Sequence, residues 1–122
     1  MRTRAIAAAV AVTALLLLLL ATATAGAAGA APGDDIDIRG LDANGATTDM
    51  LTREMDLYGL PQIGRATTLR QAIWVCSHLP GADDSTRAEM VEQLWDANPW
   101  TAADAALFLT VAAEVLCPGA GA

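Results

Sequence analysis

Apolar side chains recur at the three- and four-residue spacing of one helix face over residues 47–118. The first stretch places Leu51, Met55 and Tyr58 on one side, and Gly59, followed closely by a proline, ends it. No stretch shows the strict alternation of apolar and polar residues that is typical of a strand. The pattern therefore predicts an all-α domain of three or four short helices.

A second helix is expected to begin near Thr67 or Thr68 and to end before Pro80-Gly81. Its apolar stripe consists of Leu69, Ile73, Cys76 and Leu79. Because these residues follow the helical period, we expect the stripe to face the core of the domain.

Capping boxes are expected at the starts of the third and fourth helices. In such a box, the hydroxyl of the first residue and the carboxylate three positions later each accept a hydrogen bond from a free backbone N–H group. Thr86 with Glu89 forms one box, and Thr101 with Asp104 forms the other. The predicted apolar faces of these two helices are Met90, Val91, Leu94 and Trp95, and Ala105, Phe108, Ala112 and Val115.

The first thirty residues have the pattern of an export signal. Two arginines precede an uncharged run that includes leucines at 15–20, and small residues then offer cleavage after Ala25 or Ala30. We therefore interpret residues 1–30 as a signal peptide. The alternative is an uncleaved membrane anchor, because the uncharged run exceeds the roughly 20 residues needed to span a bilayer. Both interpretations place the remaining chain outside the cytoplasmic membrane.

Residues 31–46 are expected to form a flexible acidic linker, since Ile36, Ile38 and Leu41 are its only large apolar residues. So little apolar surface should not offset the entropy lost on ordering the chain. At the other end, Pro118-Gly119 stops the last helix and leaves a short tail.

The linker contains Asp42-Ala43-Asn44-Gly45, which is similar to part of a calcium-binding loop. With Gly45 at the sixth loop position, however, Gly40 and Leu51 would occupy positions that require oxygen ligands, so the register fails. Weak calcium binding by Asp34, Asp35 and Asp37 is the remaining alternative to a solvated acidic segment. No metal-binding residues are predicted.

The charge balance excludes classes of partner. The chain has 14 acidic residues against 7 basic ones, all arginine, and a net charge of −7. Without the two arginines of the leader, five arginines face 14 acidic residues, which gives −9. Phosphate backbones and anionic lipid headgroups should repel such a chain. We therefore expect no nucleic-acid partner, and membrane attachment only if the leader is retained.

Cys76 and Cys117 are the only cysteines, and in an exported chain they most simply form one disulfide. A core of about 70 residues is seldom stable without such a link. Closing a loop of about 42 residues contributes about 4 kcal/mol in the loop-entropy model.

Candidate catalytic groups have simpler structural explanations. Cys76 and His78 are two residues apart on a helix and should point in different directions, which disfavours a catalytic or metal-binding pair. Asp83-Asp84 should interact with a helix N-terminus, and Glu89 belongs to a capping box. Nucleotide-binding loops and a serine-hydrolase elbow are absent from the sequence. We predict no catalytic or cofactor-binding residues and no enzymatic activity.

The three tryptophans, Trp74, Trp95 and Trp100, have two interpretations. In a small bundle they are most often core or half-buried residues. Alternatively, Trp95, Pro99 and Trp100 form an exposed aromatic patch that binds a partner protein or an apolar molecule of the cell envelope.

Several segments resemble a known family. They are Tyr58-Gly59-Leu60, a helix bearing Cys76, Asp96-Ala97-Asn98-Pro99, and Cys117-Pro118. Together they are similar to small exported mycobacterial proteins of the domain of unknown function 732 family, over about residues 49–118. The chain departs from that pattern at Ser77-His78-Leu79-Pro80, where the family usually has small-residue turns. The resemblance implies an exported, helical, disulfide-linked protein, and it supplies no catalytic residues.

These observations lead to one functional hypothesis with two alternatives. The chain is expected to be a non-enzymatic interaction protein of the mycobacterial cell envelope or medium. The alternatives are a carrier of a small apolar ligand, and the same domain tethered to the membrane by an uncleaved leader.

Overall fold

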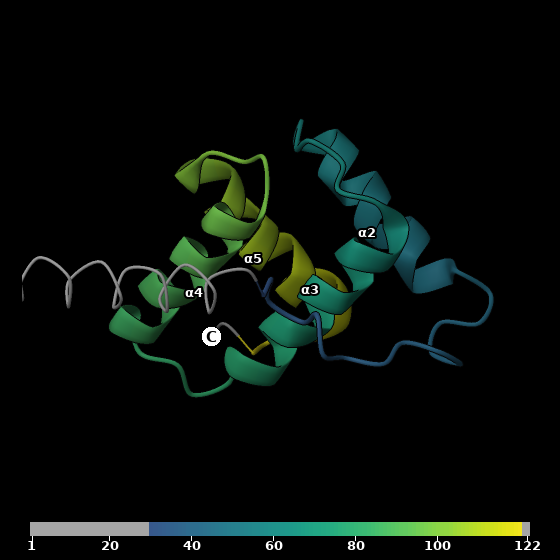
Figure 1. Cartoon of the computed structure of the whole chain (residues 1–122), viewed down its shortest axis with the longest axis horizontal. Coiled ribbons are helices and arrows are strands. Elements are labelled where there is room, and N and C mark those ends of the chain that lie inside the picture. The colour runs from purple at the N-terminus through teal and green to yellow at the C-terminus, as the bar shows by residue number, and fades with distance from the viewer. Residues whose placement is uncertain (1–29, 121–122) are drawn as a thin grey trace, which may run out of the picture. The chain divides into compact units, whose positions relative to one another are not determined.

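The computed structural model describes residues 30–120, and four helices occur in that range (Figure 1). They are α2 (Ala46–Leu57), α3 (Arg65–His78), α4 (Asp84–Ala97) and α5 (Ala102–Leu116). The described residues contain no strand. The predicted all-α class is confirmed, whereas the predicted signal peptide lies outside the described residues.

The most apolar helix, α5, packs against all three others, and α2 also packs against α3. In Figure 1, α4 lies on one side of α5 and α2 on the other. The residues of α5 that are fully buried in this core are Ala105, Phe108, Val111 and Ala112. Each large apolar side chain buried in this way contributes about 1.5–3 kcal/mol relative to exposure. The expected core positions Leu51, Met55 and Leu94 are fully buried as well.

The end of α2 follows the predicted stop signal. Gly59 has a φ of 72°, a conformation that glycine adopts without steric cost. Its N–H donates to the carbonyl of Asp56 (3.1 Å), and the N–H of Leu60 donates to the carbonyl of Met55 (2.8 Å). This is a Schellman motif. Tyr58 is 49% exposed, so its predicted place on the core face is wrong.

The start of α4 differs from the predicted one. Asp83 is the N-cap residue, and its carboxylate accepts a hydrogen bond from the N–H of Thr86 (2.8 Å). The predicted capping box of Thr86 and Glu89 is therefore wrong, because an aspartate is as good a cap as a threonine and stands three positions earlier.

By contrast, the predicted capping box of α5 is confirmed. Thr101 Oγ1 accepts from the N–H of Asp104, and the Asp104 carboxylate accepts from the N–H of Thr101 (3.1 Å each).

The start of α3 is also earlier than predicted, at Arg65. Thr68 is not a cap: it is fully buried, and its hydroxyl donates to the carbonyl of Gly64 (2.7 Å). This bond satisfies the hydroxyl one turn inside the helix, at a position that the core surrounds.

Residues 31–45, which precede α2, lie against the helical domain. Pro32 and Gly33 are buried, and Ile36 and Ile38 pack against the core. Gly33 has a φ of 84°, and a Cβ atom there would lie 2.5 Å from the carbonyl oxygen of Arg70. The backbone thus approaches α3 more closely than any side chain would permit. We expect a flexible acidic linker here from the sequence, whereas residues 32, 33, 36 and 38 contact the domain, because few apolar residues suffice where the backbone can approach so closely.

Within residues 30–120, no single helix is long and apolar enough to cross a membrane. α4 and α5 reach that length only when counted together, across a bend of 113°.

Candidate functional site

The structure separates the predicted aromatic patch into a buried and an exposed part. Trp100 is only 5% exposed, its Nε1–H donates to the carbonyl of Pro61 (2.9 Å), and its ring lies 4.9 Å from that of Phe108. Trp95 is 47% exposed, and Pro99 is exposed as well. The patch is therefore wrong at Trp100, which is a core residue that joins the α4–α5 turn to the α2–α3 loop.

Asn98, in the same turn, forms a paired amide contact that the sequence did not predict. Its Nδ2 donates to Gln71 Oε1 (2.8 Å) and to the carbonyl of Leu94 (2.8 Å), and Gln71 Nε2 donates to Asn98 Oδ1 (3.2 Å). Gln71 is 1% exposed. A buried amide must find hydrogen-bond partners, and the Gln71 and Asn98 side chains supply them for each other. Gln71 lies outside the predicted apolar stripe of the second helix, so nothing in the sequence indicated its burial.

The outer face of α4 is what remains of the patch. Val91, Trp95 and Pro99 are spaced four residues apart in the sequence, and we call them the Trp95 ridge. Val91 packs partly against the core and Pro99 follows the extended C-cap residue Asn98, so Trp95 is the ridge residue that α4 itself exposes. Beside it, exposed Glu89, Glu92 and Asp96 follow the helical period, and we call them the acidic stripe. Among the described residues, no ion pair involves the acidic stripe. The ridge and the stripe form the candidate interaction surface.

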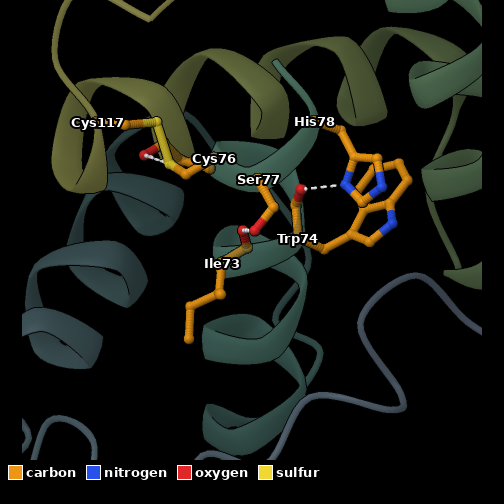
Figure 2. Close-up of a disulfide and its surroundings, with 7 residues drawn as sticks. Ile73, Trp74, Cys76, Ser77, His78 and Cys117 are labelled. Atoms are coloured by element: carbon orange, nitrogen blue, oxygen red, sulfur yellow. Dashed lines mark hydrogen bonds between the residues drawn. A yellow bond between two sulfur atoms is a disulfide. The ribbon is translucent and has the colours of Figure 1, made fainter. Parts of the chain in front are cut away.

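The predicted disulfide between Cys76 and Cys117 is present, and it joins α3 to the end of α5 (Figure 2). The two Cα atoms are 5.9 Å apart, a usual separation for such a bond. Cys76 Sγ lies 3.8 Å from the carbonyl oxygen of Ala112 in α5. Neither cysteine is a free thiol.

His78 points away from this disulfide, as Figure 2 shows. Its Nδ1 is 2.9 Å from the carbonyl oxygen of Trp74, so the Nδ1–H group donates a hydrogen bond to that oxygen. The His78 ring lies 4.9 Å from the Trp74 ring. Cys76 and His78 thus do not share a site, in agreement with their spacing. His78 is exposed at the C-terminus of α3, as expected.

The aspartate loop before α2 caps that helix. One oxygen of the Asp42 carboxylate accepts from the N–H of Thr47 (2.9 Å), and the other accepts from the N–H (2.8 Å) and the hydroxyl (2.6 Å) of Thr48. Asn44 Oδ1 accepts from the N–H of Ala46 (3.1 Å). The capping residue itself is Gly45, which has no side chain, so the side chains of Asp42 and Asn44 supply the acceptors for the first N–H groups of α2.

The hydrogen bonds that Asp42 accepts favour its ionised form. The Thr48 hydroxyl, together with the N–H groups of Thr47 and Thr48, holds the pKa of Asp42 below its ordinary value. Likewise, the N–H and hydroxyl of Thr86 lower the pKa of Asp83 at the start of α4. Both carboxylates also lie at the positive ends of helices.

Two other aspartates of residues 31–46 have local partners. Asp34 accepts from the N–H of Ala31 (2.9 Å), and Asp37 pairs with Arg39 (2.8 Å), which lowers the pKa of Asp37. Over residues 30–120, no group of three or more acidic, histidine or cysteine side chains is arranged to hold a metal ion.

Among the grooves on the described surface, two are lined in part by α5. One has a volume of about 480 Å³ and lies beside the disulfide end of α5; its apolar lining consists of Leu79, Leu109, Ala113 and Pro118, and Arg87 and Glu114 are its charged lining residues. The other has a volume of about 320 Å³ and lies between α2 and α5, next to Met50 and Leu57. The first lies within the size range of small-ligand sites.

Comparisons with known proteins place the chain in a family. No curated protein and no solved structure matches it significantly. A family model described as "Protein of unknown function (DUF732)" matches residues 49–119, which is more than half of the chain and includes all of α3, α4 and α5. The resemblance found in the sequence is confirmed at the level of the family, and the chain belongs to the DUF732 family of proteins of unknown function.

Proposed function

We propose that this chain is an exported, non-enzymatic interaction protein that acts in the cell envelope or the medium of a mycobacterium or a related actinobacterium. The observation that carries the export is the disulfide between Cys76 and Cys117. Disulfides persist in oxidising compartments and are rare in the cytosol. The pattern of residues 1–30, which is typical of a signal peptide, supports the same localisation.

Composition supports the proposed origin. The chain has no lysine and is rich in alanine and arginine, which suits a GC-rich actinobacterial genome. The family match agrees with this origin without specifying it.

The uses of the buried polar side chains support a non-enzymatic role. Thr48 binds Asp42 at the start of α2, Thr68 binds the carbonyl of Gly64, and Gln71 pairs with Asn98. Each of these contacts holds a helix end in place. Catalytic carboxylates or imidazoles usually have pKa values shifted toward the working pH, whereas the carboxylates of Asp42 and Asp83 are shifted away from it.

A carrier of a small apolar ligand is the second candidate. The groove of about 480 Å³ beside the disulfide favours it, because most of its lining is apolar. A third possibility is the same domain held at the membrane by an uncleaved leader, outside the cytoplasmic membrane.

Fractionation of the native host distinguishes these candidates. The protein is recovered from medium, membranes and cytoplasm, and its N-terminal residue is identified by mass spectrometry. A chain beginning at Gly26 or Ala31 in the medium supports export. A full-length chain found only in membranes supports the tethered form, and one found only in the cytoplasm contradicts the proposal.

An organic extract of the recovered protein tests the carrier candidate. A stoichiometric lipid or other apolar compound in the extract supports a carrier. If protein purified without detergent gives an extract that lacks such a compound, the result argues for the interaction protein.

A further inference from the structure

Within the part of the chain that the structure describes, the outer face of α4 carries a half-exposed tryptophan. α4 packs mainly against α5, and Met90 and Leu94 supply that contact. On its other side, Trp95 leaves 47% of its surface in solvent. Trp100, five residues later, is buried with its N–H satisfied, so exposure of a tryptophan is not a general property of this segment.

The charges beside Trp95 make this face anionic. The acidic stripe of Glu89, Glu92 and Asp96 puts carboxylates three and four residues apart, a spacing at which like charges destabilise a helix. No cation of the described residues pairs with them, although Arg65 and Arg39 pair with acidic residues elsewhere. The helix thus carries an electrostatic cost that its own packing does not explain.

Charge complementarity selects the occupant of this face. A second copy would bring one acidic stripe against another, and a nucleic acid or an anionic membrane would bring phosphates against it. A basic protein segment would instead place its cations beside carboxylates. An arginine or lysine side chain can also stack on an exposed indole, because the face of the ring attracts cations.

We infer that the Trp95 ridge and the acidic stripe together form a docking surface for an arginine- or lysine-rich segment of a partner protein. This inference rests on the proposed role as an interaction protein. One basic side chain of the segment lies over the Trp95 indole, and neighbouring ones pair with Glu92 and Asp96. Pro99, which is exposed four residues after Trp95, supplies further apolar surface.

Nuclear magnetic resonance of the isotope-labelled, oxidised protein tests the surface directly. The probe is a synthetic peptide in which arginine alternates with alanine, and the reference is the same peptide with glutamate in place of arginine. We expect the arginine peptide to shift the indole N–H signal of Trp95 and the amide signals of residues 88–99. The buried indoles of Trp74 and Trp100 serve as internal controls and should not shift.

Substitutions identify the contribution of each part. Trp95→Ala should weaken binding by about two- to fivefold, the scale of one exposed cation–π contact. Replacing the acidic stripe by Glu89→Gln, Glu92→Gln and Asp96→Asn should weaken it by about tenfold and reduce its salt dependence. Tyr58→Ala and Glu54→Gln remove an exposed aromatic and a half-buried carboxylate of α2, away from α4, so they should leave affinity unchanged.

Three outcomes would overturn the inference. They are the absence of shifts in α4, equal shifts with the glutamate peptide, and binding that is insensitive to Trp95→Ala. Fractionation keeps this result separate from the proposed function. A secreted protein without shifts in α4 overturns the docking surface alone, whereas a cytoplasmic protein overturns the proposed function whatever the peptide does.

Discussion

The two ends of α5 are held by different kinds of contact. At its C-terminal end, a single covalent bond joins Cys117 to Cys76 of α3. At its N-terminal end, several weaker contacts act together: the capping box of Thr101, the buried ring of Trp100, and the amide pair of Asn98. Since α5 packs against every other described helix, both ends fix the position of the central element.

The disulfide and the non-covalent contacts stabilise the two ends of α5 in different ways. A disulfide acts largely by restricting the unfolded chain, so its effect depends on the length of the closed loop. The contacts at the other end act only in the folded state and require accurate packing of three segments. Changes at the two ends should therefore have different effects on stability.

Removal of the disulfide should have the largest effect. The double substitution Cys76→Ser and Cys117→Ser should lower the free energy of unfolding by about 4 kcal/mol, an upper-end value for a loop of this length. That is comparable to the whole stability of a domain of this size, so cooperative thermal unfolding near 37 °C should be lost. Circular dichroism during heating measures this, and a melting curve equal to that of the native protein would contradict it.

Truncation of Trp100 should have the next largest effect. Trp100→Ala removes a buried ring and leaves a cavity beside Phe108, which should cost about 3 kcal/mol, the lower end of the range for a buried aromatic side chain. Trp95→Ala is the matched control: Trp95 is half exposed, and its loss should change stability by no more than about 0.5 kcal/mol. Chemical denaturation of both variants compares them. Equal losses would show that Trp95 and Trp100 are not divided between surface and core.

The amide pair should contribute less. Asn98→Ala leaves the buried Gln71 amide without its partner, which should cost about 1–3 kcal/mol. Adding Gln71→Met to that variant removes the unsatisfied group and should restore part of the loss. A double-mutant cycle measures the coupling between the two residues. Additive effects would contradict a direct contact between the side chains.

The contribution of Asp42 to the pH dependence of stability should be the smallest of these effects. Because the folded-state pKa of Asp42 is lowered from 3.8, its contribution is fully present above that ordinary value and is lost as pH falls through the lowered pKa. Asp42→Asn should therefore reduce the loss of stability on acidification. Asp35→Asn removes a charge from the same segment without removing a cap, and it should leave the acid response unchanged. Identical acid titrations for the two variants would contradict the capping role.

Features of this fold that depend on neighbouring residues could be predicted from the sequence. The end of α2 at Gly59 and the capping box of Thr101 each involve residues within five positions of one another. The disulfide was predictable because Cys76 and Cys117 have no other partner of their kind.

Features that depend on distant segments could not be predicted. Trp100 is buried because its turn meets the carbonyl of Pro61, which is 39 positions away, and Asn98 pairs with Gln71 across 27 positions. The Asp42 cap requires a backbone φ of 52° that turns the carboxylate back toward α2. Neither the long-range packing nor this turn leaves a periodic pattern, so the sequence leaves Trp100 open between the core and an exposed patch, and it predicts a flexible linker around Asp42.

The thiol state of the native protein tests the account most directly. Intact mass is measured on protein from the medium, before and after reduction, followed by peptide mapping without reduction. We predict a mass increase of about 2 Da on reduction and one linked peptide containing Cys76 and Cys117. Two free thiols in the native protein would contradict it, because α5 would then lack its covalent attachment and the main support for export would be lost.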